Sequence, residues 1–168
     1  MTHKTSREDR ARQRKSPLPF DAAEARERLA TFFGTTPAAL AAFLFGSRAR
    51  GRAHPSSDVD IAVWVDPSLA EVERALLGLE WMARLPDVLG YPGDIDVAIL
   101  NDGPPPLAWD VVYAPVVLYE AEPELALAVA AQVRRAYRDE LPRLERQWKR
   151  LHDEIARGEF GVSQQSHR

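Results

Sequence analysis

The chain has 168 residues, with 22 Lys and Arg against 25 Asp and Glu, a formal net charge of −3 and no cysteine. This length predicts one domain with a hydrophobic core, and the lack of cysteine excludes disulfides, thiolate zinc sites and a cysteine nucleophile. The slightly acidic balance argues against stable nucleic-acid binding, which requires many cations. Because no apolar run has the length of a membrane span or the form of a secretory signal, we expect a cytoplasmic protein with no membrane partner.

Composition divides the chain into three parts. Residues 1–18 are polar and mostly basic without apolar periodicity, so we expect a flexible basic arm. Residues 19–160 carry the periodic apolar patterns of one folded domain, and residues 161–168 are expected to form a loose tail.

The first half of the domain begins with a helix and an apolar run. Asp21 stands where a helix N-cap is expected, and Gly34 ends the helix that follows. Residues 37–45 suggest a short buried strand, although their alanine content leaves a helix open. After Gly46, residues 47–51 are expected to begin a short helix, followed by a loop.

Two later segments alternate between aliphatic and acidic residues, which is typical of half-buried strands. Over residues 58–65 one face carries Val59, Ile61, Val63 and Val65, and the other carries Asp58, Asp60, Ala62 and Trp64. Over residues 91–100 one face carries Ile95, Val97 and Ile99, and the other carries Asp94, Asp96 and Ala98.

The remaining segments predict helices and one further strand. Residues 66–85 are expected to form a helix capped by Asp66 or Ser68, with an apolar face made of Leu69, Val72, Ala75 or Leu76, Leu79 and Met82. Residues 104–113 predict a proline-started helix, and residues 114–120 predict a final strand.

From residue 122 to about residue 157, apolar residues recur every three or four positions. This spacing indicates one long helix, or two helices joined at Pro142. The apolar stripe either covers the protein's own sheet or binds a partner, and Trp148 within it is a candidate interface residue.

Strands and helices alternate along the chain, and aspartates lie near the start of two of the expected strands. We therefore predict an α/β (α+β) fold with a small mixed β-sheet flanked by helices and followed by C-terminal helices. If both acidic strands bury their aliphatic faces, Asp58, Asp60 and Asp96 emerge together on the opposite face.

Three carboxylates on one surface need a counter-charge. The four histidines lack metal-ligand spacing, so the expected metal is a hard ion bound through oxygen. Mg²⁺ fits these requirements, and two such ions can hold the attacking and leaving oxygens of a displacement at phosphorus.

Gly46 and Ser47 are expected at the other end of the same site. A glycine lets the backbone approach a ligand closely. Ser47 adds a hydroxyl at a helix N-terminus, where free N–H groups attract phosphate.

The spacing of Gly46-Ser47, Asp58 and Asp60, followed by Asp96 on a second strand, resembles the nucleotidyltransferase superfamily that includes DNA polymerase beta. Within it, the sequence FGSRARGRAHPSSDVDIAV is similar to the minimal nucleotidyltransferases, which act as antitoxins beside HEPN-domain toxins. The resemblance covers most of the chain outside the N-terminal arm, and it implies the polymerase beta-like nucleotidyltransferase fold.

The resemblance implies roles for individual residues. Asp58 and Asp60 would be metal ligands, and Asp96 would be the third carboxylate and the acceptor of a proton from the attacking hydroxyl. Gly46 and Ser47 would hold the phosphates of ATP. Asp94 has the same strand parity as Asp96 and is an alternative to it.

The arginines beside this motif have two interpretations. Arg48, Arg50 and Arg52 either brace the triphosphate or are solvated surface residues.

The resemblance further implies transfer of AMP from ATP to a tyrosine hydroxyl of a cognate HEPN ribonuclease toxin. The absence of a second large domain favours a macromolecular acceptor. Two alternatives are a small-molecule nucleotidyltransferase of the aminoglycoside type and a binding-only antitoxin that neutralises its partner by occlusion.

Overall fold

The computed structural model describes residues 18–158, within which there are five helices and four strands. In chain order these are α2 (Ala22–Gly34), β1 (Ala39–Phe45), α3 (Gly46–Ala49), β2 (Val59–Val65), α4 (Glu71–Leu89), β3 (Ile95–Ile99), α5 (Pro105–Tyr113), β4 (Val116–Glu120) and α6 (Leu125–Ala156). The expected basic arm, apart from Leu18, and the expected C-terminal tail lie outside the described residues.

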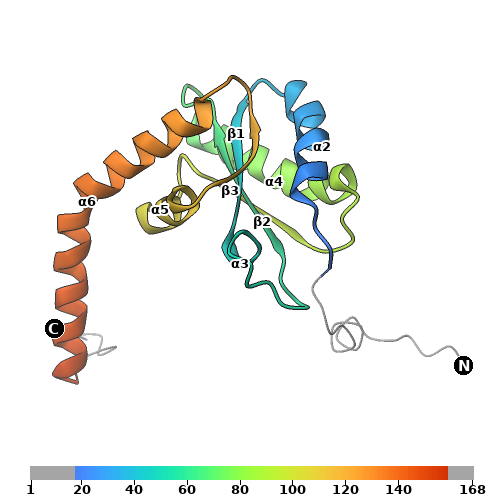
Figure 1. Cartoon of the computed structure of the whole chain (residues 1–168). Coiled ribbons are helices and arrows are strands. Elements are labelled where there is room, and N and C mark those ends of the chain that lie inside the picture. The colour runs from blue at the N-terminus through green and yellow to red at the C-terminus, as the bar shows by residue number, and fades with distance from the viewer. Residues whose placement is uncertain (1–17, 159–168) are drawn as a thin grey trace, which may run out of the picture.

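A mixed four-stranded sheet in the order β3-β2-β1-β4 forms the centre of the fold. β1 pairs antiparallel with both β2 and β4, whereas β2 and β3 are parallel. Helices α2 and α4 cover one face of the sheet, and α5 and α6 cover the other (Figure 1). The prediction of a small mixed sheet flanked by helices is confirmed.

Each face of the sheet has its own hydrophobic core. The larger core joins the aliphatic face of β2 to α2 and α4 and includes Ile61, Phe33 and Trp81. The smaller core joins the opposite face, through Ala62 and Phe43, to α5 and α6. The period-2 pattern of residues 58–65 therefore predicted which side chains of β2 share a face, and Asp60 lies on the α5 and α6 side with Ala62.

The predicted N-cap of α2 and the predicted strand at β1 are both confirmed. The Asp21 carboxylate accepts a hydrogen bond of 2.7 Å from the Ala23 amide and caps α2. The apolar run that left strand and helix open is a strand, because β1 lies between β2 and β4 and pairs with both.

Helix α4 begins later than the sequence predicted. Asp66 accepts a 2.8 Å hydrogen bond from the Ser68 amide in a turn that precedes the helix. The N-cap position is Ala70, whose amide donates to the Glu73 carboxylate at 2.8 Å. The prediction that Asp66 or Ser68 caps the helix is wrong, because the Asp66 carboxylate is used to close this turn.

The buried face of α4 also differs from the prediction. The expected apolar face is exposed at Val72, Leu76, Leu79 and Met82, and Leu79 is 63% exposed. The helix instead buries Gly78, Trp81, Leu85 and Leu89, with Trp81 only 1% exposed.

Two features of this face favour its burial. Trp81 is the largest apolar side chain of the helix and meets the Phe33 ring edge-on, with 5.2 Å between ring centroids. Gly78 permits close approach to β3, since a Cβ there would lie 3.2 Å from the Ile99 side chain.

Helix α6 is continuous through Pro142, so the alternative of two separate helices is wrong. Proline removes one backbone donor and bends a helix, and α6 changes direction partway along its length in Figure 1. Its first turns bury Ala126, Val129, Ala130 and Val133 against the sheet and α5.

The second half of α6 leaves the body of the protein. Tyr137 stacks on Trp109 of α5 at 4.8 Å between ring centroids. Between Tyr137 and residue 158, where the described part of the chain ends, no apolar residue belongs to either core. Trp148 is 68% exposed, and Ile155 is 55% exposed. The apolar stripe therefore covers the protein's own sheet along the first part of α6, as one of the two interpretations expected. Along the second part it does not.

None of the helices within residues 18–158 combines the length and hydrophobicity needed to cross a bilayer.

The buried face of α4 can be tested by the effect of substitutions on the free energy of unfolding. Trp81→Ala should lower the free energy of unfolding by about 3–5 kcal/mol, because it empties a buried aromatic site. Leu79→Gln should change it by no more than about 0.5 kcal/mol, because Leu79 is exposed. Urea unfolding followed by circular dichroism measures both, and a large loss for Leu79→Gln with a small one for Trp81→Ala would show that α4 packs through the other face.

Candidate active site

The candidate site is built where β2 and β3 begin. In the register of the sheet, Asp60 is opposite Asp96 across the parallel pair and opposite Phe45 on β1. Neighbouring strands lie about 4.8 Å apart, and paired residues point to the same face. The fold therefore brings two carboxylates from separate strands together on the α5 and α6 side of the sheet.

Asp58 joins this pair from the loop. It lies immediately before β2, outside the strand, and is exposed. Its charge acts on Asp60 in the same direction as the charge of Asp96. The three aspartates predicted from the sequence therefore form one electrostatic group around the half-buried Asp60.

The Asp60 carboxyl group has a raised pKa. Burial raises its pKa above the ordinary value of 3.8, and the nearby carboxylates of Asp96 and then Asp58 raise the pKa further, whereas the Arg48 guanidinium lowers it. Partial burial and two neighbouring carboxylates therefore both disfavour the charged form of Asp60.

Gly46 closes the site from the end of β1. Its φ angle is +68°, and a Cβ built on it would lie 2.1 Å from Oδ2 of Asp60. Only glycine fits both the left-handed backbone and this close approach. The glycine predicted to face a ligand therefore also makes room for the half-buried Asp60 carboxylate.

Ser47 follows in α3 and is half-buried. Its carbonyl accepts a 2.8 Å hydrogen bond from the Arg52 amide, which closes the turn after the short helix. Ser47 directly follows Gly46 in the chain, and its contact with phosphate stays a prediction.

The three arginines of the motif have different environments. The Arg48 side chain bonds to the carbonyls of three residues and to a tyrosine hydroxyl. Arg50 pairs with Asp110 of α5, and Arg52 is exposed. Nothing in the sequence signalled the Arg50–Asp110 pair, because its members are 60 residues apart.

A pocket of about 240 Å³ adjoins Gly46 on the α5 side. Arg50 and Asp110 contribute its polar lining, and Phe45, Val111 and the exposed Tyr113 contribute much of its apolar lining. The pocket is therefore continuous with the candidate site through Gly46.

Asp94 is placed differently from Asp96. It lies in the loop before β3, and its carbonyl accepts a 3.2 Å hydrogen bond from the Val59 amide. Asp96 is the residue in register with Asp60, and Asp96 rather than Asp94 contributes to the raised pKa of Asp60. The geometry favours Asp96 as the third carboxylate.

The donor set determines which metal would fit. Within residues 18–158 no three His, Cys, Asp or Glu side chains are already arranged to hold a metal ion. The aspartate group offers only carboxylate oxygens, which suit a hard cation such as Mg²⁺, and its mutual repulsion would be relieved by a bound cation. The chemistry of these residues therefore fits a divalent hard metal.

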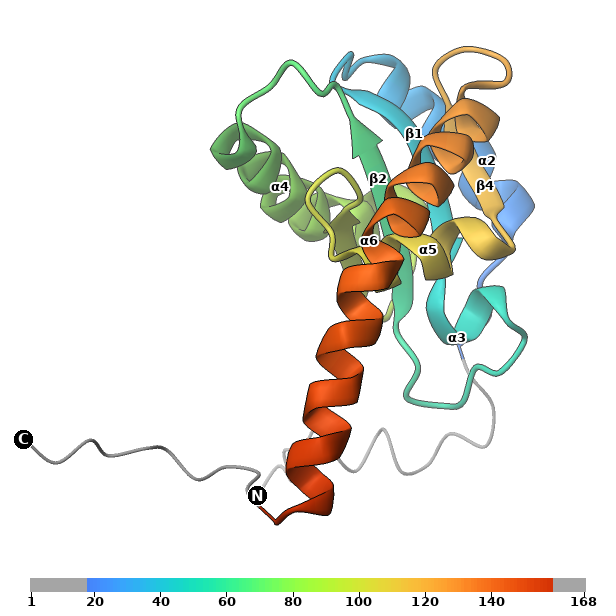
Figure 2. The same cartoon turned by 90° about the vertical axis from the view of Figure 1, so that its left-hand side faces the viewer.

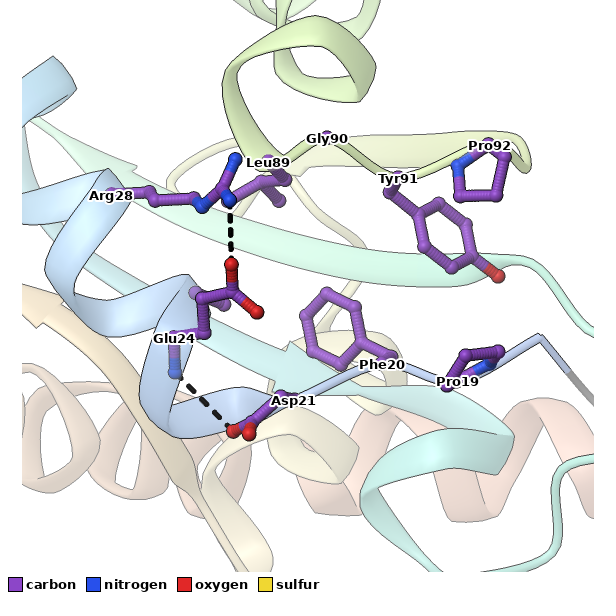
Figure 3. A pocket seen from close by; sticks show the side chains of 10 residues that line it. Pro19, Phe20, Asp21, Glu24, Arg28, Leu89, Gly90, Tyr91 and Pro92 are labelled. Carbon is purple, nitrogen blue, oxygen red and sulfur yellow. Dashed lines mark hydrogen bonds and ion pairs between the residues drawn. The ribbon is translucent and has the colours of Figure 1, made fainter.

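A second pocket, of about 260 Å³, lies on the other side of the sheet between the start of α2 and the loop after α4. Figure 3 shows Phe20 and Tyr91 facing each other there, with Glu24 paired to Arg28. Arg28 pairs with Glu24, the Asp21 carboxylate accepts from backbone amides of α2, and none of the predicted site residues lines this pocket.

Comparison with known proteins identifies the fold family. The family described as "Polymerase beta, Nucleotidyltransferase" matches residues 27–124, a span that contains Gly46 and the three aspartates. A search of curated proteins finds no match.

Solved structures of toxin–antitoxin complexes share this fold. A chain from a toxin-antitoxin crystal structure with AMP-PNP is 22% identical, with a TM-score of 0.56 over 78% of this chain and 98% of that chain. A chain from MntA-HepT is 18% identical, with a TM-score of 0.52 over 81% and 99%. A chain from a complex of the tri-AMPylated Shewanella oneidensis HEPN toxin with MNT antitoxin is 18% identical, with a TM-score of 0.53 over 81% and 99%.

The close contact between Gly46 and the Asp60 carboxylate can be tested by substitution, with Gly51 as the control. Gly51 has a similar φ of +64° but open space around its Cβ position. Gly51→Ala should therefore cost about 1–2 kcal/mol of folding free energy from backbone strain alone. Gly46→Ala should cost more, because its methyl group also displaces the Asp60 carboxylate. Equal losses in urea unfolding for the two variants would show that Gly46 does not contact Asp60.

Proposed function

Because this chain belongs to the polymerase beta nucleotidyltransferase family, we propose that it transfers AMP from ATP to a hydroxyl group and releases pyrophosphate. The observation that carries the proposal is the register of the sheet. Asp60 and Asp96 are paired across β2 and β3, and the backbone of Gly46 lies against Asp60. The backbone that we propose holds phosphate and the carboxylates that we propose bind metal therefore lie close together.

Each residue of the site has a proposed role. Asp58, Asp60 and Asp96 would hold Mg²⁺, with two ions expected, and Asp96 would also accept the proton of the attacking hydroxyl. Gly46 and Ser47 would hold the phosphates of ATP, and Arg50 at the edge of the adjoining pocket is a candidate for a further phosphate contact. When bound, the metal would neutralise charge that develops on the phosphate oxygens.

Proton transfer from the acceptor depends on where Asp96 lies. Its side chain is exposed, whereas Asp60 is half-buried behind Gly46. An acceptor hydroxyl approaching from solvent can therefore reach Asp96 without displacing the backbone at Gly46. Most of the rate enhancement would come from positioning and charge neutralisation.

We further propose that the acceptor is a tyrosine of a cognate HEPN toxin, for which this chain is the antitoxin. The fold relatives include a complex of MNT antitoxin with a tri-AMPylated HEPN toxin. The projecting half of α6 supports a protein acceptor, because it presents apolar side chains that no other described part of the chain covers. It extends past the end of the sheet where α3 lies, which is also the end of the candidate site (Figure 2).

Label transfer tests this function. The chain is incubated with labelled ATP, Mg²⁺ and the protein encoded by the neighbouring gene, and the label on that partner is measured. Asp60→Asn and Asp96→Asn should each reduce labelling by at least about 100-fold, because each removes a charge that acts in the transition state. Asp94→Asn is the matched control and should keep most of the activity.

Other outcomes would redirect the assignment. Neutralisation of the partner without label, unchanged in Asp60→Asn, would make this chain a binding-only antitoxin. Label on an aminoglycoside in place of the partner would indicate a small-molecule enzyme. Loss of activity in Asp94→Asn but not in Asp96→Asn would assign the third carboxylate to Asp94.

A further inference from the structure

The side chain of Arg48 connects three segments that are distant in sequence. Its Nε donates to the Asp58 carbonyl at 2.9 Å, and Nη1 donates to the Leu18 carbonyl at 2.9 Å. Nη2 donates to the Ser57 carbonyl at 2.7 Å and to the Tyr91 hydroxyl at 2.6 Å. The guanidinium carbon also lies 5.4 Å from the centroid of the Tyr91 ring.

These bonds leave Arg48 little capacity for a phosphate. A guanidinium has five N–H donors, and the four hydrogen bonds above leave one of them. A bidentate phosphate contact needs two. Arg48 in this conformation therefore bonds to the protein's own backbone, while its positive charge also acts on Asp60.

The segment that Arg48 holds contains the one site aspartate outside the sheet. Asp60 and Asp96 belong to strands, whose ladder fixes their backbones. Asp58 precedes β2 and has no place in that ladder. Two of the four Arg48 bonds go to Asp58 and to Ser57 immediately before it.

The anchor on the other side of Arg48 is rigid. Tyr91 is 6% exposed and meets the Phe20 ring edge-on at 5.9 Å. In Figure 3 the Tyr91 ring lies over Phe20, with its hydroxyl turned away from the pocket. A Cβ on Gly93 would lie 2.6 Å from the Tyr91 ring, so the loop fits closely around it.

We propose that Arg48 is a positioning residue that holds the Ser57–Asp58 backbone against Tyr91 and Leu18, so that the Asp58 carboxylate lies beside Asp60 before a cation binds. The inference rests on the proposed function only in requiring a divalent cation at the aspartates. If the proposal is correct, cation binding depends on the forked shape of the Arg48 guanidinium as well as on its charge. Lysine keeps the charge but cannot reach these separated acceptors with one ammonium group.

The test measures cation binding in the absence of nucleotide and partner. Mn²⁺ is titrated into the full chain, and free Mn²⁺ is followed by electron paramagnetic resonance. Arg48→Lys and Arg48→Gln should both weaken Mn²⁺ binding about tenfold, which is typical when a residue supporting a metal ligand is lost. Arg84→Lys, at an exposed ion pair on α4, is the control and should bind like the unchanged protein.

The Mn²⁺ affinity of Arg48→Lys distinguishes a positioning role of Arg48 from an effect of its charge alone. Binding of Mn²⁺ as tight as that of the unchanged protein would overturn the proposal and return Arg48 to a role of charge alone. Absence of Mn²⁺ binding in the unchanged protein would overturn it as well. A failed label transfer together with Arg48-dependent Mn²⁺ binding would contradict the proposed function and leave this inference standing.

Tyr91→Phe provides a second test if the Arg48 variants do not fold. Without the hydroxyl the guanidinium loses one anchor, so backbone amides over residues 52–58 should exchange with deuterium faster and Mn²⁺ should bind more weakly. Unchanged exchange together with unchanged affinity would contradict the proposal.

Discussion

The parallel pairing of β2 with β3 is the constraint on which the site depends. It places Asp60 opposite Asp96 at the start of both strands, and the aliphatic side chains of the larger core hold that register. A slip of one residue would turn the aspartates into the larger core and move the valines to the opposite face of the sheet. The stability of the fold is therefore what keeps two mutually repelling carboxylates together.

This arrangement opposes folding locally and serves function. The raised pKa of Asp60 shows that its charged form is disfavoured by burial and by its neighbours. Gly46 adds a positive φ that only glycine adopts easily. A carboxyl group with a raised pKa next to a residue with positive φ is locally unfavourable. Such a combination is typical of a functional site.

The sequence predicted the parts of the fold that depend on short-range pattern. Strict alternation identified β2 and the face that carries Asp60, because strand parity follows directly from spacing. The pattern predicted the wrong apolar face of α4, because apolar residues repeat with helical spacing on both faces. Trp81 and Gly78 decide it through contacts with Phe33 and Ile99, which are distant in sequence.

In the candidate site, too, the sequence predicted what depends on residue type and spacing, and it did not predict contacts between residues distant in the chain. Gly46, Asp60 and Asp96 were found because their residue types and spacing carry the chemistry. The surroundings of Arg48 were not, because its acceptors are backbone carbonyls and Tyr91 lies 43 residues away. Carbonyl acceptors have no sequence signature, so an arginine that positions a loop and one that binds phosphate look alike in sequence.

Two apolar surfaces remain outside the cores of the described residues, one on α4 and one on the projecting half of α6. The α6 surface is the more informative, because Figures 1 and 2 both show it extending beyond the end of the sheet that carries α3. Asp96 shares the face of the sheet that α5 and α6 cover, so a protein bound along that helix would approach the site from the same face. The position of this surface relative to the site is what links a macromolecular acceptor to the proposed chemistry.

The central claim is that the three aspartates bind a divalent cation beside a triphosphate. The most direct test is a crystal structure with Mn²⁺ and a non-hydrolysable ATP analogue, using anomalous scattering to locate the metal. We predict an anomalous peak about 2.1 Å from carboxylate oxygens of Asp58 and Asp60, with the phosphates against Gly46 and Ser47. A metal or triphosphate bound elsewhere, with these carboxylates uncoordinated, would contradict the account.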